Sequence, residues 1–321
     1  MNNDTLSFSI IIPTYARPLP LAGCLESLTR LESPAAGFEV IVVDDGSPQP
    51  LDEIVKPWRD RLNLTLMRQS NSGPGAARNA GAERACGRFL AFTDDDCRPA
   101  SDWLTALARR FEQSPQNLLG GSTVNELTHN SYATASQILI DVVYAFYNRR
   151  PEEPRFFASN NIAVPAELFR QSGGFDPQSF PLVAAEDRDF CDRWRRQGRQ
   201  MTFAREAVVW HAHDLTLRDY CKQHFTYGRG ALHFDRALRN RNDGRPRDDS
   251  GFLAQLPRLL KEPLRELPTA QVFKVLPLVF LSQAVNAVGF FYEAYYHRQR
   301  FHEGQTSAPA GLPGRTERLS G

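Results

Sequence analysis

The 321-residue sequence has little of three features that mark common classes of protein. Its formal net charge is only +1, from 38 Lys and Arg against 37 Asp and Glu, so it lacks the basic excess of a dedicated nucleic-acid-binding protein. Its five cysteines are odd in number, scattered and without CxxC spacing, which argues against a disulfide framework and a zinc site. The first residues have no basic segment, and their apolar run is too short for a signal peptide, so we expect no secretion. We therefore expect a cytoplasmic protein with reduced thiols.

Two glycine patterns are missing as well. The stretch SGPGAARNAG (72–81) has Gly73 and Gly75, but Arg78 stands where a dinucleotide-binding fingerprint needs its third glycine. The stretch PTYARPLP (13–20) contains no glycine, so the glycine-rich loop of sugar-phosphate nucleotidyltransferases is absent. What remains is a glycine turn that opens a helix, and we expect Arg78 and Asn79 at the wall of a phosphate or ribose site.

Strand-like and helix-like runs alternate over the first hundred residues. The apolar runs predict strands at 8–15, 38–47, 62–69 and 88–96, and the intervening periodicity predicts helices at 20–31, 51–61 and 73–85. Such an order predicts an α/β fold with a parallel sheet between helices, which the 321 residues can accommodate. Ligands of these sheets bind beyond the carboxyl ends of the strands. Polar groups follow three of these ends, at 14–18, 44–47 and 94–96.

Three consecutive aspartates, Asp94, Asp95 and Asp96, end the fourth predicted strand. Carboxylates held close together repel unless protons or a cation neutralise them. One interpretation is a site for Mg²⁺ or Mn²⁺, which prefer oxygen ligands and leave positions open for substrate phosphates. The other is a solvated turn before a helix. The polar groups at the two other strand ends favour the cation.

Six motifs occur together in one order: IIIPTYARP (10–18), VIVVDDGS (40–47), ARNAG (77–81), FTDDD (92–96), NNIAVP (160–165) with GGFD (173–176), and AEDRDFCDRWRRQGR (185–199). Over residues 7–214 the chain resembles the family 2 glycosyltransferases of GT-A fold. The resemblance implies a Rossmann-like, mostly parallel sheet flanked by helices. It also implies metal-dependent, inverting transfer of a hexose-like sugar from a nucleotide-diphospho-sugar, with UDP preferred. The QxxRW motif of many processive relatives is absent, which favours transfer of a single sugar.

The resemblance also implies roles for individual residues. The first motif and Asp45 would contact the nucleobase, on which aromatic Tyr15 can stack. Asp96 would bind the metal and Asp94 the ribose or a metal-bound water, with Asp95 as the rival, and His211 would be a third ligand or a phosphate contact. The complete predicted donor-binding set is Pro13, Thr14, Tyr15, Arg17, Asp45, Arg78, Asn79, Asp94 and Asp95.

The pair Glu186–Asp187 opens a helical run and carries the predicted base. Transfer to a hydroxyl needs a carboxylate that takes the proton, and the resemblance implies Asp187 in that role, with Asn161 and Glu186 on the acceptor side. A single base opposite the leaving group implies direct displacement with inversion. The alternative is that these acids only stabilise a helix N-terminus. A non-catalytic nucleotide-sugar or glycan binder, and less so a nucleotidyltransferase, are the competing functions.

We expect a GT-A domain over 1–217, with its nucleotide-binding part at about 7–100 and its acceptor part at about 101–217. A helical, membrane-associated extension at 218–300 and a disordered tail at 301–321 would follow. The uncharged run 275–292 is at the lower limit of length for a bilayer span, and an interfacial or helix-pairing segment is the alternative. We expect attachment at the inner face of the plasma membrane, which suits a glycan or lipid-linked acceptor.

Overall fold

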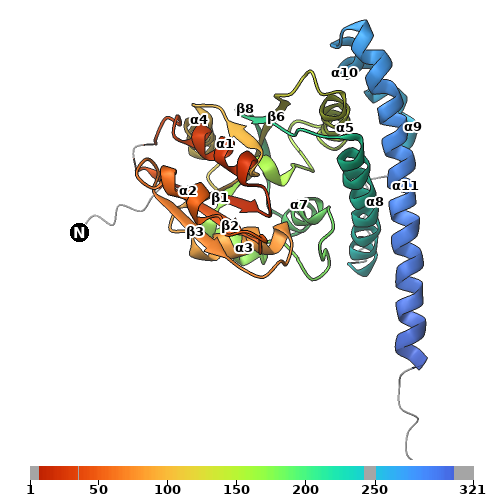
Figure 1. Cartoon of the computed structure of the whole chain (residues 1–321), viewed down its shortest axis with the longest axis horizontal. Coiled ribbons are helices and arrows are strands. Elements are labelled where there is room, and N and C mark those ends of the chain that lie inside the picture. Colours follow the sequence, from red (N-terminus) through yellow and green to blue (C-terminus); the bar gives the residue numbers. More distant parts are fainter. Residues whose placement is uncertain (1–6, 35, 242–250, 307–321) are drawn as a thin grey trace, which may run out of the picture.

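One mixed sheet organises the chain in the computed structural model, which describes residues 7–34, 36–241 and 251–306 (Figure 1). Within these residues eight strands lie in the order β3-β2-β1-β4-β7-β6-β8-β5. Their bounds are β1 (Phe8–Thr14), β2 (Phe38–Asp44), β3 (Leu64–Arg68), β4 (Phe89–Phe92), β5 (Cys97–Pro99), β6 (Leu118–Asn125), β7 (Ile162–Pro165) and β8 (Met201–His211). Strands β1 to β4 run parallel, as do β6 and β8, whereas β7 and β5 are antiparallel to their neighbours. The predicted α/β class with a mostly parallel sheet is confirmed.

Helices cover both faces of the sheet and continue beyond it. They are α1 (Pro18–Leu28), α2 (Asp52–Val55), α3 (Pro74–Arg84), α4 (Trp103–Gln113), α5 (Ser131–Tyr147), α6 (Ala166–Ser172), α7 (Glu186–Arg196), α8 (Leu217–Asn240), α9 (Phe252–Leu259), α10 (Lys261–Arg265) and α11 (Thr269–Thr306). Helix α2 is shorter than the helix predicted over 51–61 and continues as a 3₁₀ turn at Lys56–Trp58. Pro57 has no N–H to donate, which limits helix growth at that point.

The alternation of side chains along β1 creates a core on each face of the sheet. Ile10 and Ile12 pack in one cluster with Leu25 of α1. Ile11 points the other way and packs in a second cluster with Ala77 of α3 and Phe190 of α7. Successive side chains of a strand point to opposite faces, so one apolar run supplies both cores. The sheet is thereby held rigidly between two layers of helix.

The aspartate run lies in a turn and not in the strand predicted over 88–96. Strand β4 ends at Phe92, and β5 begins at Cys97 after the three aspartates. Because β5 pairs with β8 in a register that sets Cys97 opposite His211, the turn is brought beside the end of β8. Residues more than a hundred positions apart in the sequence thus meet at one edge of the sheet.

The C-terminal helices stand beside the sheet as a separate layer, with α8 and α11 side by side (Figure 1). A Cβ on Gly228 of α8 would collide with the carbonyl oxygen of Asn286, and one on Gly289 of α11 with that of Phe225. The two backbones can approach only because both positions are glycine. The described residues include one segment, Thr269–Tyr296, that is long and apolar enough to cross a membrane.

The C-terminal boundary differs from the expected one. Helix α11 extends to Thr306, into the tail predicted to be disordered from residue 301. Residues 307–321, the remainder of that tail, lie outside the described residues.

Candidate active site

A cavity of about 1320 Å³ opens at the carboxyl ends of β1, β2 and β4 and extends to α5, α8 and α11. Most of the predicted site residues line it: Pro13, Thr14, Tyr15, Arg17, Asp45, Arg78, Asp94, Asp95, Glu186, Asp187 and His211. Three non-glycine residues with positive φ lie in or next to this lining, Ala16 at 54°, Leu182 at 55° and Ala185 at 83°. Left-handed backbone is unfavourable for residues with a Cβ and clusters at functional sites.

The aspartate run is neutralised from the side of β1. Arg17 contacts Asp95 at 2.9 Å and Asp96 at 2.6 Å, and the Thr14 hydroxyl donates to Asp95 at 2.6 Å. Burial raises the pKa of Asp95 to about 7 despite Arg17. Burial opposes ionisation of Asp96 too, but His211 and Arg17 hold its pKa well below the usual range. Asp96 is therefore the firmly ionised member of this pair.

Arg78 ties the aspartate run to the acid pair of α7. Its guanidinium donates to Asp94 at 2.7 Å and to Glu186 at 3.0 Å, and Arg78 is only 3% exposed. A buried arginine with two carboxylate partners fixes their separation, because its planar group donates in fixed directions. Asp94 and Glu186 thus lie on either side of the Arg78 guanidinium in the wall of the cavity.

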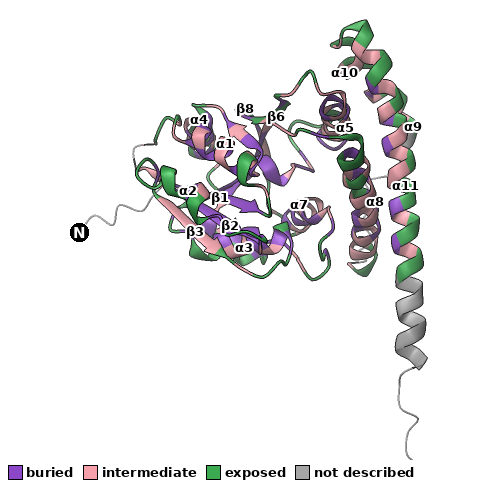
Figure 2. Cartoon of the chain, in the orientation of Figure 1, coloured by how far each residue is buried: buried purple, intermediate pink, exposed green. Residues whose placement is uncertain are grey.

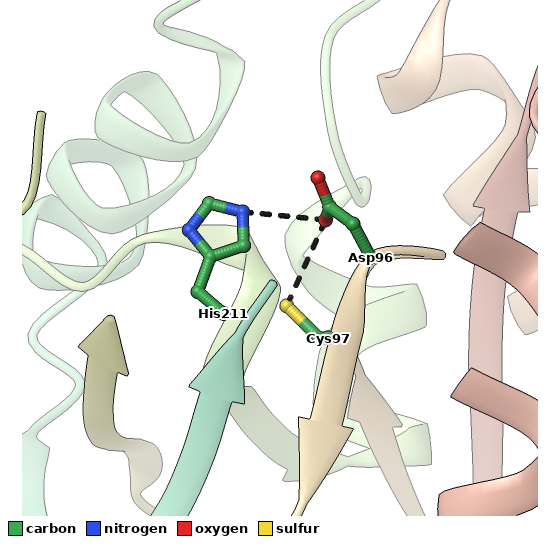
Figure 3. A group of neighbouring side chains, drawn as sticks. All are labelled: Asp96, Cys97 and His211. Atoms are coloured by element: carbon green, nitrogen blue, oxygen red, sulfur yellow. Dashed lines mark hydrogen bonds and ion pairs between the residues drawn. The ribbon is translucent and has the colours of Figure 1, made fainter. Parts of the chain in front are cut away.

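Asp96, Cys97 and His211 form a compact group of possible metal ligands, contributed by the turn, β5 and β8 (Figure 3). Their ligand atoms lie within 4.8 Å of one another, and His211 Nε2 is 3.2 Å from Asp96 Oδ1. Burial raises the pKa of the Cys97 thiol well above its ordinary value, so the thiol stays protonated and is a poor ligand. The carboxylate and the imidazole remain, and they fit a divalent cation completed by substrate oxygens.

The acid pair at the start of α7 faces the cavity. Asp187 accepts hydrogen bonds from the backbone N–H of Ser159 at 3.3 Å and of Arg188 at 2.7 Å. Burial raises the pKa of Asp187, and burial together with the charge of Asp187 raises the pKa of Glu186 to about 7. Asp189 is fully buried and pairs with Arg193 and Arg241. Glu186 and Asp187 thus face the cavity, whereas Asp189 has a structural role.

Three predicted residues lie outside the cavity lining: Asn79, Asp96 and Asn161. Asn79 bonds through both atoms of its amide to the backbone of Phe175, so it holds the GGFD turn. Asn161 is 1% exposed, donates to the carbonyls of Ser122 and Ala207, and accepts from the Trp103 indole. The expected wall and acceptor contacts of these asparagines do not match their positions. Asn160, its neighbour, does line the cavity.

Asp45 lines the cavity but is already engaged. Its carboxylate accepts from the Gln69 side chain at 2.7 Å and from the backbone N–H groups of Ser72 at 2.9 Å and Gly73 at 2.8 Å. A carboxylate has about four acceptor positions, so one is left for a ligand. The predicted contact with the base stays a prediction.

The far wall of the cavity was not anticipated from the sequence. It includes Gln223, His224 and Tyr227 of α8 and Asn286 of α11. Residues three and four apart share a helix face, so the spacing of the first three was a usable signal. The spacing alone does not show which part of the molecule this face of α8 contacts.

Carboxylates, arginines and an imidazole gathered at the carboxyl ends of an α/β sheet suit an enzyme that binds a nucleotide diphosphate at this edge. Residues 9–173 match the family described as Glycosyl transferase family 2. The chain is 31% identical to glycosyltransferase AglE of Haloferax volcanii, over 71% of this chain and 74% of AglE. The chain belongs to glycosyl transferase family 2 and is a nucleotide-sugar glycosyltransferase.

Other similar proteins agree with this assignment. Pre-mycofactocin glycosyltransferase of Mycobacterium tuberculosis is 29% identical over 66% of this chain, which spans only 46% of that protein. The structure of mannosyltransferase PcManGT from Pyrobaculum calidifontis, in complex with GDP-Man and Mn²⁺, has a TM-score of 0.66 at 18% identity and covers 90% of this chain and 89% of its own. TarS 1-349 of S. aureus has a TM-score of 0.53 at 20% identity, with 92% of each chain covered. These structures share the fold.

Proposed function

We propose that the enzyme transfers one sugar, with inversion, from a UDP-sugar to a hydroxyl of a glycan or lipid-linked acceptor. The observation that carries this proposal is that Asp187 lines the same cavity as Asp94 and Asp95, and that Arg78 bonds both to Asp94 and to Glu186, the neighbour of Asp187. This arrangement supports a donor site and a base within the same cavity.

The donor side combines an aromatic ring with charged groups. Tyr15 is 46% exposed in the cavity and can stack on a base, and the free acceptor position of Asp45 can receive a base N–H. TarS has been solved with UDP-GlcNAc and with UDP, whereas PcManGT was solved with GDP-Man. We propose UDP as the nucleotide of the donor, and GDP is the alternative.

Asp96 and His211 are the residues that would hold Mn²⁺ or Mg²⁺. Bound there, the ion would neutralise charge on the diphosphate leaving group as a Lewis acid. Arg17 occupies one oxygen of Asp96 at 2.6 Å, and its half-exposed side chain can move toward the diphosphate.

Asp187 removes the proton of the acceptor hydroxyl. Burial raises its pKa, which makes it a stronger base than an ordinary aspartate. No second carboxylate is needed as a nucleophile in direct displacement, so the anomeric configuration inverts.

The stereochemistry of the product tests this proposal. The enzyme would be incubated with an α-linked UDP-sugar, Mn²⁺ and an alkyl glycoside, and the anomeric coupling in the product would be read by NMR. We expect a β-linked product. An α-linked product would contradict direct displacement by Asp187.

We also propose that α11 attaches the enzyme to the membrane surface, at the cytoplasmic face. Exposed residues recur along its described part, from Thr269 to Tyr296 (Figure 2). The exposed apolar residues follow helical spacing: Phe273, Pro277, Phe280, Ala284, Val288, Phe291 and Tyr295. The unpaired state of all five cysteines, Cys86 being exposed, supports a reducing compartment.

The opposite side of α11 favours a helix that lies on the membrane over one that crosses it. Glu293 of α11 is 4% exposed and pairs with Arg229 at 2.5 Å and with His233 at 3.0 Å, both on α8. A bilayer span would carry this charged partner helix into hydrocarbon. Exposed basic residues of α9 and α10, Arg258, Lys261 and Arg265, suit anionic lipid beside the apolar face.

Flotation with vesicles of phosphatidylglycerol and phosphatidylethanolamine tests this attachment. The double variant Phe280→Ser with Phe291→Ser should bind at least about tenfold more weakly, because each buried phenylalanine contributes roughly 1.5–3 kcal/mol. The matched control is Leu19→Ser on α1, an apolar residue that is 82% exposed. Equal flotation of all three proteins would contradict the attachment.

A further inference from the structure

The cavity continues past Asp187 into a space between α5, α8 and α11, here named the acceptor compartment. Its defining residues are Ser136, Leu139, Val143, Gln223, His224, Asn286 and Phe290. None of these residues belongs to the six sequence motifs, and none has a role in the proposed transfer step.

Polar atoms in this compartment lack partners. Among the described residues, neither ring nitrogen of His224 has a hydrogen-bond partner, although His224 is only 2% exposed. The same holds for Gln223 Oε1, Asn286 Oδ1 and Ser136 Oγ, contributed by three different helices. Buried polar atoms without partners are destabilising and uncommon in folded proteins. A polar ligand in the cavity would satisfy them.

The chemistry of these atoms selects the kind of ligand. The oxygens of Gln223 and Asn286 accept hydrogen bonds and therefore need a donor. Burial lowers the pKa of His224 to about 4, so its ring is neutral near pH 7 and offers one donor and one acceptor. Hydroxyl groups both donate and accept, whereas an ionised phosphate only accepts. The set matches a neutral, hydroxyl-bearing group.

Apolar side chains continue the wall beside this polar set. Leu139 and Val143 line the cavity from α5, and Ala287 and Phe290 line it from α11. Ala287 is also exposed, and it is followed by Val288 of the exposed apolar face of α11. A hydrocarbon chain can thus follow α5 and α11 from the polar set toward the outside.

Tyr227 lines the cavity that holds both the acceptor compartment and Asp187. Its hydroxyl accepts from Gln223 at 2.6 Å. Tyr227 is 45% exposed, so its ring and hydroxyl are accessible to a ligand in this cavity.

We propose that the acceptor compartment binds an amphiphilic acceptor, with a hydroxyl-bearing head on Gln223, His224 and Asn286 and a hydrocarbon tail along α5 and α11. This inference rests on the proposed function, because it names the acceptor of the same reaction. The acceptor oxygen bonds to the anomeric carbon while the bond from that carbon to the diphosphate oxygen breaks. Asp187 takes the hydroxyl proton, and the nucleoside diphosphate leaves with the bonding electrons.

Direct binding of simple probes tests the compartment without requiring transfer. Decyl β-D-glucoside, methyl β-D-glucoside and decyl phosphate would each be titrated calorimetrically into the full chain, below the micellar concentration. We expect decyl glucoside to bind at least about tenfold more tightly than either of the others. Equal binding of methyl glucoside would remove the tail from the proposal. Tighter binding of decyl phosphate would overturn the head group, and no binding of decyl glucoside would overturn both.

Variants locate the binding of decyl glucoside. His224→Phe and Asn286→Leu should each weaken it about tenfold, whereas His224→Gln, which keeps polar atoms there, should largely retain it. The matched controls are His129→Phe and Asn240→Leu, which change the same residue types at exposed positions. Unchanged binding in both His224→Phe and Asn286→Leu would contradict the site.

Donor titration separates failure of this inference from failure of the proposed function. If UDP-sugars bind and decyl glucoside does not, the compartment is wrong and the enzymatic proposal stands. If decyl glucoside binds and no sugar is transferred from any UDP-sugar, the compartment stands and the proposed reaction is wrong.

Discussion

The two ends of the cavity solve the problem of burying polar groups in opposite ways. At the donor end the charges are paired within the chain, Arg17 with Asp95 and Asp96, and Arg78 with Asp94 and Glu186. At the acceptor end the polar groups are neutral, and several of their atoms have no partner among the described residues. The donor end is therefore organised before any ligand arrives, whereas the acceptor end is completed by its ligand.

This difference follows from the charge of each group. An unpaired buried charge costs far more free energy than an unpaired buried amide. Only neutral groups can therefore remain without a hydrogen-bond partner until a ligand binds. A charged donor site has to be neutralised by movable partners such as Arg17, whose side chain is 40% exposed. The contrast predicts that changes at the two ends separate stability, donor binding and acceptor binding.

The largest expected effect is on chemistry alone. Asp187→Asn should lower kcat by roughly 10²–10⁴-fold, because the base is lost, while the affinity for the donor nucleotide stays unchanged. Single-turnover kinetics and calorimetry measure the two quantities, and Asp60→Asn on an exposed turn is the control. Parallel loss of donor affinity would show that Asp187 belongs to the donor end.

Removal of the arginine that joins the two ends should destabilise the whole protein. Arg78→Met leaves the buried Glu186 and the partly buried Asp94 without their shared partner, which should reduce the free energy of unfolding by about 3–5 kcal/mol. Arg30→Met, which breaks an exposed pair with Glu26, should cost less than about 1 kcal/mol. Urea unfolding that gives the same value for both variants would contradict the structural role of Arg78.

A change at the crossing of α8 and α11 should affect the acceptor end only. Gly228→Ala places a Cβ against the Asn286 carbonyl, so the helices must separate, at about 1–3 kcal/mol of stability. Binding of decyl glucoside should weaken while nucleotide affinity is kept. Equal weakening of both ligands would mean that the two ends are not independent.

The last expected effect concerns the pH dependence of stability. The folded-state pKa of Glu186, about 7, lies above its ordinary value of 4.5, so the folded state holds a proton that the unfolded state releases. Stability from this residue is full below the unfolded pKa and declines as the pH rises through the folded one. Relative to Glu186→Gln, the wild type should lose up to about 1.4 kcal/mol per pH unit between pH 4.5 and 7. A difference that is constant over this range would contradict the shifted pKa.

The donor end was largely predictable because its residues follow apolar strands. Polar groups after β1, β2 and β4 must gather at one edge of a parallel sheet, and Arg17, Arg78 and the aspartates do so. Sequence could not decide between adjacent residues, since the choice of Asn160 over Asn161 for the cavity depends on the local backbone of the turn before β7.

The acceptor end was much less predictable. The sequence of α8 is amphipathic and that of α11 contains the uncharged run 275–292, but the pairing of these helices depends on Gly228 and Gly289 meeting backbone carbonyls of the other helix. This contact between α8 and α11 determines which polar residues face the cavity. Helical spacing alone does not predict the contact.

Calorimetric titration with UDP, GDP and dTDP, each with and without Mn²⁺, is the most direct test of the donor end. We predict that one nucleotide binds with micromolar affinity, requires the metal, and loses binding in Asp96→Ala. The control is Asp102→Ala, an aspartate before α4 whose side chain makes no capping hydrogen bond. No nucleotide binding under either condition, or binding that is unchanged in Asp96→Ala, would contradict the assignment of the aspartate run to a metal-assisted diphosphate site.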